Sequence, residues 1–189
     1  MKPVLIINPN GSQKTTQDMV GITSRYLPNV MGWTNHKGPK MIVDRDQLYE
    51  AANQICEAVF PDASALIVAA FGDPGAKRLA RSMDIPVIGI AAAAAREAAL
   101  SGVSFAVVTS TPKLAPSIDK IMRAEGGDTY LGCYTTEDDP LVLASNSDAL
   151  DYALITSCEI ANKAGAKRII IGGGPLGQAA IRISSQVKV

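Results

Sequence analysis

The chain has 189 residues, of which 47% are hydrophobic and 19% charged, as in globular proteins that bury a sizeable core. Its 18 lysines and arginines balance 18 aspartates and glutamates without a basic run, which argues against a nucleic-acid-binding protein. No apolar stretch reaches the roughly 18 residues that a membrane span needs, and the apolar run 4–7 is too short for a signal peptide. We therefore expect a cytoplasmic protein with free thiols.

Short apolar runs rich in Val and Ile alternate along the chain with longer, helix-like stretches. The expected strands are residues 4–7, 65–70, 87–90, 105–108, 129–134 and 169–171. The expected helices are residues 13–26, 45–60, 75–82, 92–100, 115–125 and 147–164. Residues 27–44 are less clear and are interpreted as a loop with one more strand. Strands alternating with helices predict an α/β protein with parallel sheets and right-handed crossovers.

The pattern repeats in the two halves of the chain. "VLIINPNGS" and "ALIVAAFGDPG" in the first half resemble "FAVVTSTP" and "RIIIGGGPLG" in the second. This predicts two similar α/β halves, residues 1–95 and 96–189, related by a pseudo-twofold axis. Because ligands of open α/β sheets bind at the carboxyl ends of strands, we expect a cleft between the halves.

Two polar turns each follow a strand and precede a helix. The first contains Asn8 and Ser12, and the second contains Thr109, Ser110 and Thr111. Hydroxyl groups beside the free N–H groups of a helix N-terminus suit a carboxylate or a similar anion. The alternative is that these side chains only cap their helices, as Ser and Thr commonly do.

Asp73 lies in the turn "FGDPG" before an expected helix. It is interpreted either as the cap of that helix or as a carboxylate presented to the cleft. The only histidine, His36, is expected in a solvated loop.

Gly172, Gly174 and Gly177 match the G-x-G-x-x-G pattern of dinucleotide-binding sites. The rest of the chain is too short for the second strand and the ribose-binding acid of such a site. A nucleotide is therefore not expected here.

Together, "INPNGS", "FGDPG", "PVIGIA", "FAVVTSTP" and "IIIGGGPLG" resemble the aspartate/glutamate/hydantoin racemase family in order and approximate spacing. The resemblance implies cofactor-independent chemistry on small carboxylates, amino acids or hydantoins, with Gly174 among the substrate-binding positions and no metal. It also implies a C-terminal return element that would pack on the first half. Without that element, apolar surface would favour a homo-oligomer.

The resemblance implies two catalytic cysteines, at the positions of Ala70 and Gly173, and a glutamate at the position of Ala92. None of the three is present here. Cys56 and Cys158 are expected to be buried in helices, and Cys133 to lie at a strand end.

Three functions remain open from the sequence. The first is a cofactor-independent racemase or isomerase, with Asp73 as a base and Tyr134 and residues 137–139 as remoter candidates. The second is a non-catalytic protein that binds or senses a small anion through the same cleft. The third is a cysteine-free decarboxylase that stabilises an enediolate in an oxyanion pocket.

Overall fold

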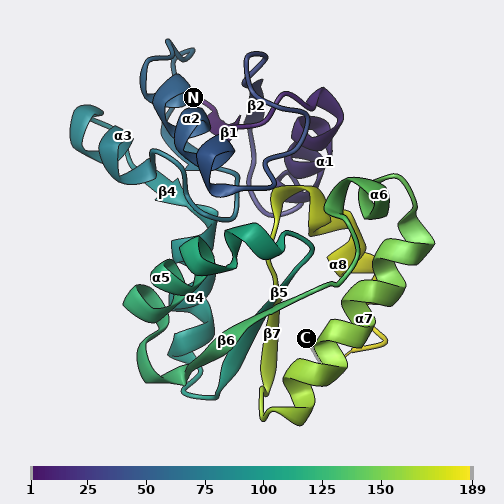
Figure 1. The fold of residues 1–189 in the computed structure, drawn as a ribbon. Helices are drawn as coiled ribbons and strands as arrows, with labels where there is room; N and C mark the ends of the chain where they lie inside the picture. The colour runs from purple at the N-terminus through teal and green to yellow at the C-terminus, as the bar shows by residue number, and fades with distance from the viewer. Residues whose placement is uncertain (1, 188–189) are drawn as a thin grey trace. The chain divides into compact units, whose positions relative to one another are not determined.

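A computed structural model describes residues 2–187, and these form two compact units, Met1–Ile90 and Ala91–Val189. Each unit is an α/β layer built on its own parallel sheet (Figure 1). The sequence places the division after residue 95, five residues later and inside a helix. Within residues 2–187, no helix is both long and apolar enough to cross a membrane.

The first unit has a parallel sheet of four strands in the order β2-β1-β3-β4. The sheet confirms the expected α/β class, and the unclear segment 27–44 does contain a strand, β2. The strands are β1 (Val4–Asn8), β2 (Val30–Thr34), β3 (Ala65–Val68) and β4 (Val87–Gly89), and the helices are α1 (Gln13–Thr23), α2 (Arg45–Cys56) and α3 (Ala76–Ser82).

The second unit has a parallel sheet of three strands in the order β6-β5-β7. The strands are β5 (Phe105–Thr109), β6 (Tyr130–Thr135) and β7 (Arg168–Ile171), and the helices are α4 (Ile90–Leu100), α5 (Ala115–Gly126), α6 (Pro140–Ala144), α7 (Ser147–Lys163) and α8 (Gly177–Ile183). Helices α6 and α8 are not expected from the sequence. Helix α6 is only five residues long, and α8 begins inside the glycine-rich motif, where glycine usually indicates a turn.

Both sheets bury apolar side chains on each face, as strands in the middle of α/β layers must. All five residues of β5 are buried. Val108 lies in a cluster with Leu154 of α7 and Ile183 of α8, and the ring of Phe105 contacts that of Tyr130, with 5.4 Å between centroids. The core of the second unit therefore lies on both sides of β5.

Strand β5 occupies the same place in its sheet as β1 does in the first. The N–H of Asn35 donates to the backbone oxygen of Asn8 at 3.0 Å. In the second unit, the N–H of Thr136 donates to the backbone oxygen of Thr109 at 3.1 Å. Asn8 thus corresponds to Thr109, and Asn35 to Thr136.

The neighbouring strands β3 and β7 repeat in the same way. The N–H of Ala69 donates to the oxygen of Ile7, and that of Gly172 to the oxygen of Val108, both at 2.8 Å. The residues that follow, Ala70 and Gly173, therefore hold equivalent places at the carboxyl ends of their strands. This register supports the repeat expected from the sequence.

Two helical glycines differ in the space around them, and their alanine variants should have opposite effects. A methyl group at Gly126 would lie 2.5 Å from Cζ of Phe105, whereas at Gly21 it would meet nothing within 4 Å. Gly126→Ala should lower the free energy of unfolding by about 1–3 kcal/mol. Gly21→Ala should raise it by about 0.5–1 kcal/mol, because alanine favours the helix. Urea denaturation followed by circular dichroism would measure both, and equal effects would contradict the packing around Phe105.

Candidate functional site

The first polar turn is organised by the buried carboxamide of Asn8. Its Nδ2 donates to Oδ1 of Asn10 at 2.9 Å, to the backbone oxygen of Ser12 at 3.0 Å and to Oγ1 of Thr16 at 3.0 Å. Its Oδ1 accepts the N–H of Asn10 at 3.1 Å. Asn8 is fully buried and Asn10 is 4% exposed. The polar atoms of Asn8 are thus engaged within the turn, as buried amides require.

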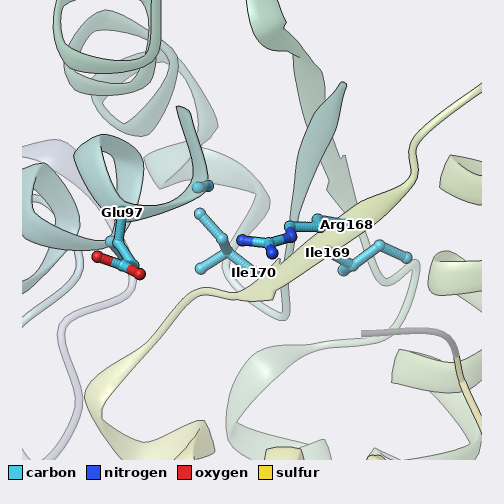
Figure 2. Close-up of a pocket in the computed structure, with 6 residues that line it drawn as sticks. Glu97, Arg168, Ile169 and Ile170 are labelled. Atoms are coloured by element: carbon cyan, nitrogen blue, oxygen red, sulfur yellow. The ribbon is translucent and has the colours of Figure 1, made fainter. Parts of the chain in front are cut away.

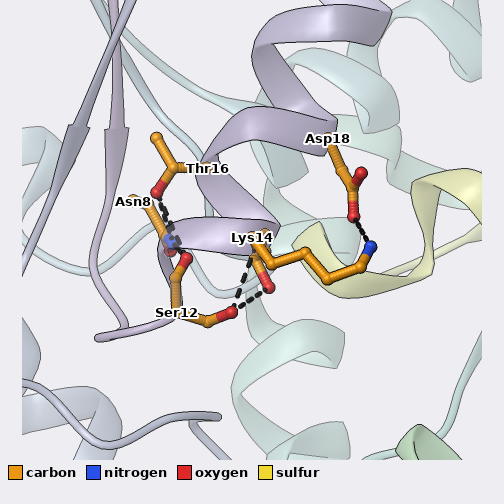
Figure 3. Close-up of polar contacts among 6 residues, drawn as sticks. Asn8, Ser12, Lys14, Thr16 and Asp18 are labelled. Atoms are coloured by element: carbon orange, nitrogen blue, oxygen red, sulfur yellow. Dashed lines mark hydrogen bonds and ion pairs between the residues drawn. The ribbon is translucent and has the colours of Figure 1, made fainter.

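Ser12 caps helix α1 (Figure 3). This agrees with the second interpretation of the sequence, in which the side chain serves as a helix cap. Its Oγ accepts the N–H of Thr15 at 3.2 Å and the hydroxyl of Thr15 at 2.9 Å. Behind it, the hydroxyls of Thr16 and Thr34 lie 2.6 Å apart and tie α1 to β2. On the outer face of α1, Lys14 pairs with Asp18 at 2.6 Å.

The loop after β2 holds the same turn from its other side. Nδ2 of Asn35 donates to the backbone oxygen of Pro9 at 3.0 Å, and the N–H of Gly11 donates to the oxygen of Pro39 at 2.7 Å. A methyl group at Gly11 would lie 2.7 Å from the oxygen of Gly38, so this approach requires a glycine. The turn is therefore fixed in shape before any ligand arrives.

The second polar turn is also buried, but its side chains make fewer hydrogen bonds. Thr109, Ser110 and Thr111 are 1%, 1% and 7% exposed. The hydroxyls of Thr109 and Thr111 lie 3.0 Å apart, and the N–H of Thr111 donates to Oγ1 of Thr109 at 3.4 Å. Thr111 precedes the 3₁₀ turn Pro112–Leu114 without a side-chain cap bond. The capping interpretation therefore fails for Thr111, although it holds for Ser12.

Thr136, which belongs to no sequence motif, is bonded to this turn through the backbone oxygen of Thr109. It is 3% exposed, and its Oγ1 is the one buried side-chain oxygen or nitrogen in residues 2–187 without a hydrogen-bond partner there. Its counterpart Asn35 instead bonds with Pro9 and with Oε1 of Gln54, at 2.6 Å. An unpaired buried hydroxyl costs free energy, and an ordered water or a polar ligand group that reached it would supply the missing partner. A threonine after a strand gives no signal of this in sequence.

Asp73 does not cap helix α3. The N-cap residue is Gly75, at φ 70°, and no side chain caps this helix. Asp73 itself has φ 47°, a left-handed conformation that Asp tolerates better than most residues. Its carboxyl group lies against Gly89 at the end of β4, where any Cβ would collide with it. The carboxylate is thus directed to the carboxyl end of the first sheet, and the capping interpretation is wrong.

Ala70 and Gly173, the positions implied for catalytic cysteines, begin matching turns. The backbone oxygen of Ala70 accepts the N–H of Asp73 at 3.0 Å, and that of Gly173 accepts the N–H of Leu176 at 2.9 Å. Gly173 has φ 161°, which is extended backbone rather than the left-handed region. A Cβ there would approach the side chain of Leu176 to 3.0 Å. Gly174 starts the 3₁₀ turn Gly174–Leu176 that leads into α8.

Two of the three cysteines have raised thiol pKa values, and the third lies in a helix of the first unit. Cys133 lies within β6, where an extra residue between Tyr130 and Cys133 places it near Asp119 of α5. Burial, with the nearby carboxylate of Asp119, raises the pKa of Cys133 to about 12. Burial alone raises the pKa of Cys158 in α7 to about 11. Cys56 is in α2, with its thiol 3.7 Å from the oxygen of Gly75.

The remoter candidates for acid–base chemistry take other roles. Tyr134 packs against the apolar cluster around Val108, and Asp139 caps α6 through the N–H groups of Leu141 and Val142. Glu137, Asp138 and His36 are exposed. Among residues 2–187, no three His, Cys, Asp or Glu side chains are grouped as a metal site.

A matched pair of Thr→Val variants would test whether the threonine hydroxyl is hydrogen-bonded in the first turn and unpaired in the second. Thr16→Val should lower the free energy of unfolding by about 1–3 kcal/mol, because Asn8 and Thr34 would each lose a buried partner. Thr136→Val should leave it unchanged or raise it by about 1 kcal/mol, because the hydroxyl it removes is unpaired. Urea denaturation would compare them. A loss in Thr136→Val as large as that in Thr16→Val would show that its hydroxyl is bonded.

The raised thiol pKa values predict slow alkylation and a loss of stability at high pH. At pH 8, iodoacetamide should modify Cys133 and Cys158 far more slowly in the folded protein than in urea, as peptide mass spectrometry would measure. Since both folded pKa values exceed the ordinary 9.0, their contribution to stability is complete below pH 9 and is lost as pH rises toward 11–12. Cys133→Ala should make this decline shallower. Fast labelling of Cys133 at pH 8 would contradict its burial.

Comparison with known proteins connects these strand ends to a family. The sequence model of Asp/Glu/Hydantoin racemase matches residues 4–189. A hydantoin racemase from Paenarthrobacter aurescens is 25% identical over 182 residues, covering 89% of this chain and 76% of its own.

Two solved structures share the fold. An allantoin racemase from Pseudomonas fluorescens has a TM-score of 0.89 and 23% identity, over 99% of this chain and 83% of its own. An allantoin racemase from Klebsiella pneumoniae has a TM-score of 0.83 and 23% identity, and the match covers 100% of this chain and 81% of that protein. With the family match over nearly the whole length, the chain belongs to the Asp/Glu/hydantoin racemase family.

Proposed function

We propose that this protein binds a small carboxylate or hydantoin at the carboxyl ends of its strands without the two-thiol racemisation that the family resemblance implies. The single observation that carries the proposal is that Ala70 and Gly173, equivalent in the two halves, both lack a side chain that can exchange a proton. The remaining thiols are held protonated in the second unit or lie in α2. A general base has to be ionisable near the operating pH, and neither methyl nor hydrogen is.

Binding is supported by the polar groups at the end of the second sheet. The hydroxyls of Thr109 and Thr111, with the unpaired hydroxyl of Thr136, can donate to a carboxylate or to an imide oxygen. In the first unit, α1 begins directly after the polar turn, and the N-terminus of a helix suits the same class of anion. Thr136 is our main candidate for contact with the ligand, and Asn8 and Ser12 shape the turn.

A second candidate function is an isomerase that uses one base. It is favoured by Asp73, whose left-handed backbone holds a carboxylate at the end of β4. One carboxylate can remove an acidic proton and return it to the same face or to a neighbouring atom. It cannot supply the second, opposing acid that inversion requires.

The test is a thermal-shift screen of small carboxylates and hydantoins, followed by deuterium exchange on each ligand found. We expect stabilisation by a ligand and no loss of α-deuterium. Thr136→Val should weaken the binding by about tenfold, the loss of one hydrogen bond to a charged group. Loss of α-deuterium without inversion, abolished in Asp73→Asn, would favour the one-base isomerase instead. If Thr136→Val left binding unchanged, the ligand would not bind at Thr136.

Restoring both thiols should create the missing chemistry on the same ligand. Ala70→Cys adds one sulfur to an existing Cβ, whereas Gly173→Cys must shift Leu176 slightly, at a cost of about 1–3 kcal/mol. The double variant should exchange α-deuterium with inversion, measured by NMR and chiral chromatography. Each single variant, the matched control, has only one of the two thiols and should not invert. A folded, ligand-binding double variant without exchange would show that other parts, such as the glutamate replaced by Ala92, are also missing.

A further inference from the structure

The segments that follow β2 and β6 correspond in sequence as well as in backbone bonding. They span residues 35–44 in the first unit and 136–146 in the second, and each ends at the N-cap of a long helix, α2 or α7. Both have a proline at the fifth position and a buried aliphatic residue at the eighth, Ile42 in one and Leu143 in the other. The two segments can therefore be compared position by position.

In the first unit, this segment is bonded to the polar turn through a side chain and through the backbone. Nδ2 of Asn35 donates to the oxygen of Pro9 at 3.0 Å, and the N–H of Gly11 donates to the oxygen of Pro39 at 2.7 Å. Both bonds engage polar groups that could otherwise meet a ligand. The first turn is therefore closed by its own chain.

The described part of the second unit lacks both bonds. Pro112 holds the place of Gly11 and has no N–H to donate. Thr136 holds the place of Asn35, and because the backbone repeats, its side chain leaves the chain on the same side. That side chain is shorter, and its hydroxyl is unpaired. Among residues 2–187, the N–H of Thr136 makes the one hydrogen bond between this segment and the second polar turn, to the oxygen of Thr109. The second turn thus keeps a buried polar group available, whereas the first does not.

A basic pair of residues in the first segment is replaced by an acidic pair in the second. The second and third positions are His36 and Lys37 in the first segment. They are Glu137 and Asp138 in the second, and all four side chains are exposed. In the part of the chain that the structure describes, neither of the two carboxylates takes part in an ion pair. The second turn has one cation next to it in sequence, Lys113. The surroundings of the unpaired hydroxyl are therefore net negative.

A groove elsewhere in the second unit does not favour a cation in this way. It is lined by Glu97 of α4 and Arg168 of β7, and the rest of its lining is apolar (Figure 2). Arg168 is the first residue of β7, so the groove lies at the amino end of that strand. With one charge of each sign, this groove has no preference for a positively charged group.

We propose that Glu137, Asp138 and the hydroxyl of Thr136 recognise a positively charged nitrogen, such as an ammonium group, on the ligand. This recognition rests on the binding proposed above, and it narrows the ligands to acids that also carry an amine. A hydroxyl oxygen accepts a hydrogen bond as well as donating one, so it can face either kind of group. Because the two carboxylates belong to the next two residues, they lie within a Debye length of about 10 Å from the hydroxyl and favour the cation.

The probes are two pairs of acids that differ only in the amino group: aspartate with succinate, and alanine with propanoate. Isothermal titration calorimetry on the whole chain should show tighter binding of the amino acid in each pair. The preference should shrink in about 1 M salt, because exposed carboxylates are screened there.

A charge reversal locates the recognition on this segment. Asp138→Lys introduces the residue that the first unit has at the same position, and it should weaken binding of the amino acid about fivefold relative to the plain acid. Asp128→Lys is the matched control, because Asp128 is also exposed but precedes the other end of β6, and it should keep the preference. Circular dichroism would confirm that both variants fold.

Two results would overturn the recognition and leave the binding of a ligand standing. One is equal affinity for the two members of each pair, and the other is a preference that Asp138→Lys and Asp128→Lys change to the same extent. If none of the four acids bound, both this recognition and the proposed binding of small carboxylates would be wrong.

Discussion

The backbone hydrogen bonds from Asn35 to Asn8 and from Thr136 to Thr109 fix the way in which the two central strands end. Each bond extends a parallel ladder by one residue beyond the sheet and brings the loop after the neighbouring strand onto the polar turn. Because these strand ends are buried, every polar group there needs a partner. The shape of each turn, and what it can offer a ligand, follows from how that need is met.

The two units provide hydrogen-bond partners for these buried polar groups in different ways. In the first, the carboxamide of Asn8 bonds with Asn10, Ser12 and Thr16, and that of Asn35 bonds with Pro9, so side-chain amides hold the turn in shape. In the second, threonines take their place, and a hydroxyl has fewer bonding groups than an amide. One oxygen, that of Thr136, remains unpaired. A repeated backbone thus carries a fully bonded turn in one half and a turn with an unpaired hydroxyl in the other.

The sequence predicts the backbone better than the roles of the side chains. Continuous apolar runs locate β1 and β5 because both faces of these central strands are buried, and the backbone register places Ala70 and Gly173 at equivalent strand ends. The sequence leaves open whether Asp73 caps α3 or faces the strand ends, because Gly89, against which its carboxyl group lies, is 16 positions away in the sequence. The orphaned hydroxyl of Thr136 could not be predicted, since nothing local distinguishes it from a satisfied threonine. Burial and pairing of such groups depend on tertiary contacts.

Ala70 and Gly173, where the family resemblance implies cysteines, hold their strand ends through the backbone and not through side chains. At Ala70 and Gly173 the structural work is done by the backbone oxygens, which accept the N–H groups of Asp73 and Leu176 in matching turns. Any residue can provide such an oxygen, so a change of side chain at these two positions leaves the backbone bonds in place. The turns at Asn8 and Gly11 have no such freedom, because side-chain amides and close backbone contacts build them. The hold on these strand ends therefore comes from backbone atoms, and side chains at the two positions can differ without a change of fold.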